Sequence, residues 1–139
     1  MGYHISIGEL EYDAKEAAEG ATGWFVETIK NHAAPQVLGV PFLDKSNDRS
    51  PSYTVWRLFS MEADVSDFFY DSTGRLKCES PGFFEISSET VEYFQAAYER
   101  YKKTGTGEGY DQNVNRLEWL AFWTDYALKN CTRPAMIFL

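Results

Sequence analysis

The residues best suited to chemistry in this 139-residue chain are its two histidines and two cysteines. His4 and His32 stand in no metal-binding or triad spacing, and Cys78 and Cys131 lack a recognisable nucleophile context. The sequence therefore predicts no catalytic residue, no metal site and no cofactor. An enzyme that pairs one histidine with a carboxylate remains an alternative.

Three aspartates, Asp64, Asp67 and Asp71, supply enough carboxylates for a cation site. Their segment interposes three aromatic residues, however, and lacks the alternating oxygen ligands and the glycine of a calcium loop. At spacings of three and four residues the acids would share one face of a helix, opposite the apolar residues between them. The pattern predicts a solvated acidic face.

The glycine-rich stretch Gly105–Gly109 invites comparison with phosphate-binding loops. A dinucleotide-binding fingerprint requires a preceding strand, and a nucleotide P-loop requires a lysine followed by serine or threonine. Here a predicted helix precedes the glycines and that lysine is missing. The stretch is expected to be a flexible linker between two helices.

The formal net charge of −8 disfavours nucleic acids and anionic membranes, because both are bound mainly through lysine and arginine. Residues 1–30 hold six acids and two bases, and residues 61–99 hold nine acids and two bases. An acidic surface is explained most simply by solubility, and its concentration in two segments also fits attraction to a basic protein partner. The candidate partner-binding residues are Glu9, Glu11, Asp13, Glu16, Glu19, Asp64, Asp67 and Asp71.

Two long helices near the C-terminus have the clearest sequence signals. Ser87 is suited to cap a helix that runs to about Lys103, and a second helix with a wide apolar surface is expected from Gln112 to Asn130. Residues 135–139 are expected to return as a strand.

The signals elsewhere predict shorter elements. Alternating apolar residues predict a strand over residues 3–7, ended by Gly8, and Asp13 is suited to begin a short helix. Residues 24–32 favour a helix, another helix is expected from Ser50–Pro51, a helical turn around residues 65–69 and a brief strand at residues 76–78. The prediction is a helix-rich α+β single domain, residues 1–139, with a small sheet formed by the terminal strands.

Aromatic residues make up 17 % of the chain, and several lie on the last predicted helix. Trp119, Trp123 and Tyr126 are the candidate contact residues, although ordinary core packing is the first explanation for such a set. An alternative function is binding of a small ligand or a nucleotide derivative in a pocket lined by such tryptophan and tyrosine residues. Its anion would need arginines, for which Arg100, Arg116 and Arg133 are available.

Three segments, Gly2–Glu9, Ser50–Trp56 and Leu117–Trp123, give the chain a resemblance to short proteins carried by phages and prophages. The resemblance implies an accessory protein that binds a host or viral partner, such as an inhibitor of a bacterial defence system. It transfers no site residues. Because neither a signal peptide nor a membrane-spanning run is evident, we expect a cytoplasmic protein. Because no catalytic motif is evident either, we expect it to be a non-catalytic interaction protein.

Overall fold

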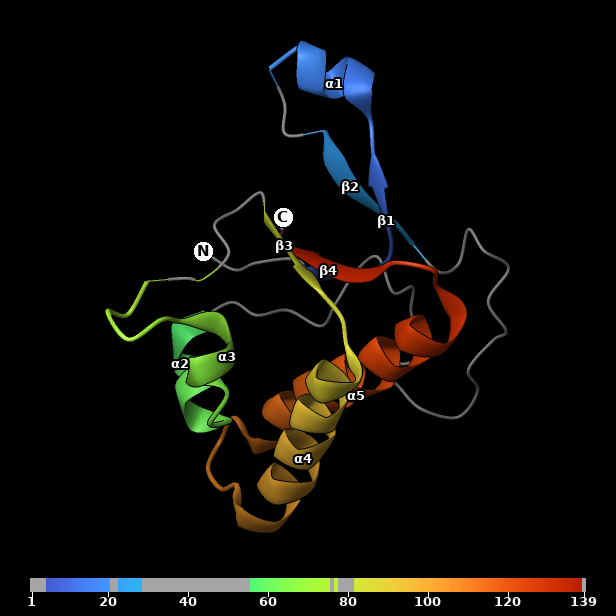
Figure 1. Ribbon diagram of the computed structural model, residues 1–139. Helices are drawn as coiled ribbons and strands as arrows, with labels where there is room; N and C mark the ends of the chain where they lie inside the picture. The colour runs from blue at the N-terminus through green and yellow to red at the C-terminus, as the bar shows by residue number, and fades with distance from the viewer. Residues whose placement is uncertain (1–4, 21–22, 29–55, 76, 78–81, 139) are drawn as a thin grey trace.

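The computed structural model describes residues 5–20, 23–28, 56–75, 77 and 82–138 (Figure 1). Within them the strands form one antiparallel sheet of order β2-β1-β4-β3, combined with helices in an α+β fold. This confirms the predicted fold class. The elements are β1 (Ile5–Tyr12), α1 (Ala14–Ala18), β2 (Trp24–Thr28), α2 (Trp56–Glu62), α3 (Ser66–Phe69), β3 (Gly82–Glu85), α4 (Ser88–Thr104), α5 (Tyr110–Asn130) and β4 (Pro134–Phe138).

The centre of the sheet is formed by β1 and β4, which bring the two ends of the described chain together. Ile7 pairs with Met136, and both are fully buried on the face that packs against the helices. Ser6 and Ile137 pair with each other and lie on the opposite face by alternation, yet they are also buried. Both faces of the sheet's centre are therefore shielded from water.

Helices α4 and α5 lie side by side against one face of this sheet (Figure 1). The helix α4 begins at Ser87, whose hydroxyl accepts a hydrogen bond from the Thr90 backbone N–H, while the Thr90 hydroxyl accepts one from the Ser87 N–H. This reciprocal cap satisfies two backbone donors at the helix start. Both long helices and the final strand are confirmed, with α5 starting at Tyr110.

The hydrophobic core joins these helices to the sheet and to α2 and α3. Phe94 of α4 is fully buried, with its ring centroid 4.8 Å from that of Phe68 and 6.0 Å from that of Phe69. From α5, Leu117 and Trp119 are also fully buried. Aromatic packing therefore accounts for much of the chain's aromatic content.

Two predictions for the N-terminal region are wrong. Residues 24–28 form a strand and not a helix, because β1 pairs with them in register, with Leu10 opposite Val26. The strand β1 does not end at Gly8, which pairs with Thr28 on one side and Ala135 on the other. In both cases the contacts that decide the structure come from segments distant in sequence.

Other predictions are confirmed or lie outside the described residues. Asp13 caps α1, as expected, and the predicted turn around residues 65–69 is α3. The helix expected from Ser50–Pro51 is described from Trp56 onward, as α2. Of the brief strand expected at residues 76–78, only Lys77 is described, and it lies in a bend. The start of the N-terminal strand at residues 3–4 lies outside the described residues.

Replacing Phe94 by alanine should lower the free energy of unfolding by about 3–5 kcal/mol, because a fully buried ring would leave a cavity. Chemical denaturation followed by far-UV circular dichroism measures the change. The exposed Glu92 on the same helix provides a control, since Glu92→Ala should change stability by less than about 0.5 kcal/mol. Equal effects of the two substitutions would contradict the described core.

Candidate functional site

Among the described residues, an arm formed by the far half of β1 with α1 and β2, residues 9–20 and 23–28, extends away from the helices (Figure 1). The Asp13 carboxylate accepts hydrogen bonds from the backbone N–H groups of Lys15, at 2.9 Å, and Glu16, at 3.2 Å. The Asp13 N–H in turn donates to the Gly23 carbonyl at 2.6 Å. One residue thus starts the helix and closes the ribbon.

Close packing at Gly23 holds α1 against the ribbon. Gly23 has a φ of +80°, in the region that favours glycine. A Cβ atom placed there would lie 2.7 Å from the Tyr12 ring and 2.9 Å from the Ala17 Cβ. The ring and the helix therefore close over a position that only glycine fills without strain.

The arm contains six acidic residues and one basic residue, Lys15. Glu9 is used inside the fold, because its carboxylate accepts hydrogen bonds from the backbone N–H groups of Thr132 and Arg133. By contrast, three other acids on the arm have neither an ion pair nor a side-chain hydrogen bond with any described residue. These unpaired acids are Glu11, Glu16 and Glu19.

Two aromatic side chains on the arm are unusually exposed. The exposed fraction is 53 % for Tyr12 and 41 % for Phe25. Phe25 lies directly opposite Glu11 in the β1–β2 register, so the ring and the carboxylate share one face of the ribbon. Neither Tyr12 nor Phe25 is among the candidate residues that the sequence pattern predicts. Recognising the alternation of β2 in place of a helical pattern would have marked Phe25 as a strand residue.

The second acidic segment differs from its prediction. Asp64, Asp67 and Asp71 do not share a helix face, because α3 is a single turn that contains only Asp67. Asp64 precedes the helix with a φ of +55°, and Asp71 follows it. The local sequence suggested a longer helix than the fold allows.

Each of these aspartates has a partner within the chain. The Asp64 carboxylate lies 3.8 Å from the Arg100 guanidinium, and the Asp67 carboxylate accepts a hydrogen bond from the Tyr93 hydroxyl. Burial and the bond to Asp67 raise the pKa of Tyr93, since both disfavour the phenolate. The segment therefore connects α3 to α4.

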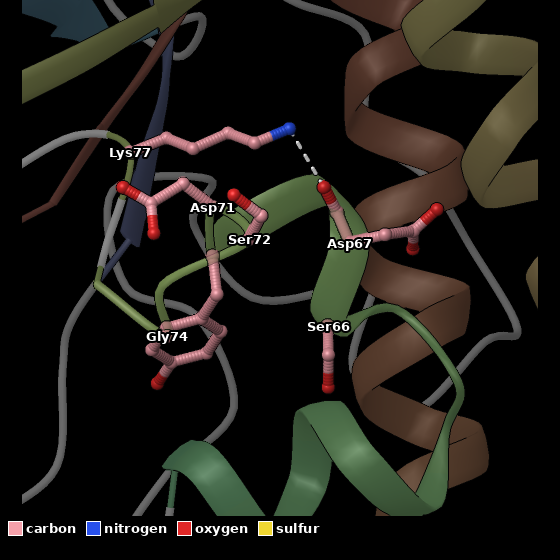
Figure 2. Close-up of a pocket in the computed structure, with 7 residues that line it drawn as sticks. Ser66, Asp67, Asp71, Ser72, Gly74 and Lys77 are labelled. Carbon is pink, nitrogen blue, oxygen red and sulfur yellow. Dashed lines mark hydrogen bonds between the residues drawn. The ribbon is translucent and has the colours of Figure 1, made fainter.

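A surface pocket of about 620 Å³ lies beside α3 and is lined by Ser66, Asp67, Tyr70, Asp71, Ser72, Gly74 and Lys77. Figure 2 shows the Asp67 and Asp71 carboxylates pointing in opposite directions. The Lys77 ammonium reaches across the pocket and donates to the Asp67 carbonyl at 2.7 Å. Because the Asp67 and Asp71 carboxylates point away from each other, the pocket does not direct an acidic and a basic side chain at one place where a substrate could react.

The aromatic candidates on α5 lie in or near the core. Trp119 and Trp123 are 0 % and 5 % exposed, so neither is available for a ligand or an interface on this surface. Tyr126 is half-buried, with its ring centroid 5.5 Å from that of Trp123. Core packing explains the two tryptophans, and neither indole N–H has an acceptor among the described residues.

The three candidate arginines are separately engaged. Arg100 contacts Asp64, Arg133 forms an ion pair with Glu85, and Arg116 donates to the Asn113 side chain at 2.8 Å. Arg100 lies on α4, Arg116 on α5 and Arg133 directly before β4. None of the three lines the pocket beside α3. No anion site formed by these arginines together is evident in the described part of the chain.

Of the remaining chemical candidates, only Cys131 is described, since His4, His32 and Cys78 lie outside the described residues. Burial, and to a lesser degree the charge of Glu9, raise the pKa of the Cys131 thiol to about 11. The described residues contain no group of three potential metal ligands close enough to hold an ion. No helix within the described ranges is long and apolar enough to cross a membrane.

Comparison of the chain with known proteins finds no matching family model, no similar curated protein and no similar solved structure.

The Asp71 carboxylate should titrate below its ordinary pKa of 3.8. Hydrogen bonds from the Thr73 hydroxyl, the Arg75 N–H and the Thr73 N–H favour the charged form, and they lower the pKa. This turn is therefore stabilised above pH 3.8 and weakens as the pH falls through the lower, folded value. Amide resonances of Thr73 and Arg75 should report a midpoint below 3.8. A midpoint at or above that value would contradict the described turn.

The Cys131 thiol should react slowly with alkylating reagents. With a pKa of about 11 against an ordinary value of 9, its thiolate fraction at pH 8 is about 100-fold smaller in the folded chain. Mass spectrometry of a Cys78→Ser variant treated with iodoacetamide isolates this residue. Comparable rates in the folded and the urea-unfolded protein would show that Cys131 is a reactive thiol after all.

Proposed function

We propose that this chain is a non-catalytic interaction protein that binds a basic partner protein through the arm. The observation that carries the proposal is the set of unpaired carboxylates on Glu11, Glu16 and Glu19, on the same arm as the exposed rings of Tyr12 and Phe25. The fold uses most of its other predicted acids internally. These three have no such use among the described contacts.

The two kinds of side chain suit different stages of binding. Carboxylates speed and orient the approach of a basic surface, and a long-range attraction of this kind weakens as salt is added. Aromatic rings contribute affinity when they become buried at the centre of an interface. The same negative charge repels phosphate backbones, which favours a protein over a nucleic acid as the partner.

The resemblance to phage and prophage proteins suggests which partner to test first. A basic component of a bacterial defence system is the partner class that we propose, with this chain as its inhibitor. A chain that works by occupying a surface needs no catalytic group. The alternative function as a small-ligand binder remains a prediction, and the burial of Trp119 and Trp123 removes two of the residues on which it was based.

Reversing the charge of the arm should weaken partner binding. In the arm variant, Glu11→Lys, Glu16→Lys and Glu19→Lys replace attraction by repulsion, so affinity should fall about 10- to 100-fold. Proteins captured from a bacterial lysate by the unaltered chain would be identified by mass spectrometry. Each would then be purified and its dissociation constant measured by calorimetry at two salt concentrations.

A control variant separates local from overall charge. Glu89→Lys, Glu92→Lys and Glu108→Lys alter three exposed acids away from the arm. Each substitution changes the charge by two units, so both variants carry −2 in place of −8. The control should retain binding. Equal losses in both variants, or affinity indifferent to salt, would overturn the arm as the docking surface.

A further inference from the structure

The outer edge of β2 is the only long edge of the described sheet that belongs to the arm. The Leu10 N–H donates to the Arg133 carbonyl on the β4 side, whereas the Asp13 N–H donates to the Gly23 carbonyl on the β2 side. Because the direction of the backbone N–H and C=O groups alternates along a strand, those of Glu11 also point toward β2 and form hydrogen bonds with the backbone of Phe25. The backbone N–H and C=O groups of Trp24 and Val26 therefore point outward, and no described strand pairs with them.

An edge of this kind is a template for an added strand. The charge of the arm decides which strand fits. A second copy of this chain would place two segments, each with six acids and one base, against each other, and the like charges would repel. A basic segment would instead bring opposite charges together along the same edge.

We infer that the outer edge of β2 receives an extended, arginine-containing segment of the partner as an additional strand. This inference rests on the proposed function and specifies how the partner is held. The residue opposite Phe25 in the added strand lies on the same face as Phe25 and Glu11. An arginine there can lie across the exposed ring and extend its guanidinium toward the Glu11 carboxylate, a combination that lysine satisfies less well.

The experiment uses a synthetic ten-residue peptide of alternating arginine and threonine as the probe. A second peptide has the same sequence and charge but carries N-methyl groups on four consecutive central amides, so that its central residues cannot donate to a strand edge. The unmodified peptide should bind the full-length chain at least about tenfold more tightly, because several backbone hydrogen bonds are lost in the methylated form. Hydrogen exchange at the Val26 amide should slow by a similar factor only with the unmodified peptide.

A pair of variants tests the same edge from the protein side. Val26→Pro removes an outward-facing N–H while leaving the charge of the arm unchanged, and proline is tolerated at such edge positions. Val26→Thr retains the N–H and serves as the matched control. Binding of the unmodified peptide should fall about tenfold in Val26→Pro and persist in Val26→Thr. The methylated peptide tests the inference on the unaltered protein, whether or not the proline variant folds.

The outcomes separate this inference from the proposed function. Equal, salt-sensitive binding of both peptides would overturn strand addition and leave electrostatic docking by the arm in place. Binding of neither peptide would also overturn it, while the charge-reversal experiment on the natural partner would still decide the proposed function. Dimerisation of the chain through residues 24–28, detected by ultracentrifugation and removed by Val26→Pro, would show that a second copy occupies the edge.

Discussion

The structure depends on the strand β1, which begins in the buried centre of the sheet and ends in the exposed arm. The first four residues of β1 are buried between its neighbouring strands and the helices. Its last two residues, Glu11 and Tyr12, are respectively half-buried and exposed. Burial of Ile5 and Ile7 in the core fixes the direction of the whole strand, since a shift of one residue would turn them to the other face. The position of the arm follows from that constraint, and Glu9 reinforces it by binding the backbone just before β4.

Local sequence signals were enough to predict the helices whose first residue is marked by a capping side chain. Ser87 caps α4 through its own hydroxyl, and Asp13 caps α1 in the same way, so both helix starts are visible in the sequence. Residues 24–28 carry weaker signals that fit either period, and pairing with β1 decides between them. A contact between two strands that are separated by α1 cannot be predicted from the sequence of either strand alone.

The candidate site shows the same division. Sequence placed negative charge in two segments, but only the structure shows which acids are already engaged. Asp71 is bound by its own turn, Asp67 by a tyrosine of α4, and Glu9 by two backbone amides, whereas Glu16 and Glu19 stay exposed. Equivalent side chains therefore differ in role because hydrogen-bond donors reach some of them and not others. A charge count alone does not contain that information.

The separation of the arm from the core also bears on how this chain can change over generations. Glu16 and Glu19 are exposed, and their replacement removes no contact that the core requires. Surface substitutions of this kind cost little stability, so sequence change there is almost independent of selection on folding. Gly23 is the exception, because its close contacts with Tyr12 and Ala17 leave no room for a side chain. Asp13 is a second exception, because its carboxylate caps α1 and its N–H closes the ribbon. The exposed acids of the arm can vary around these two fixed positions.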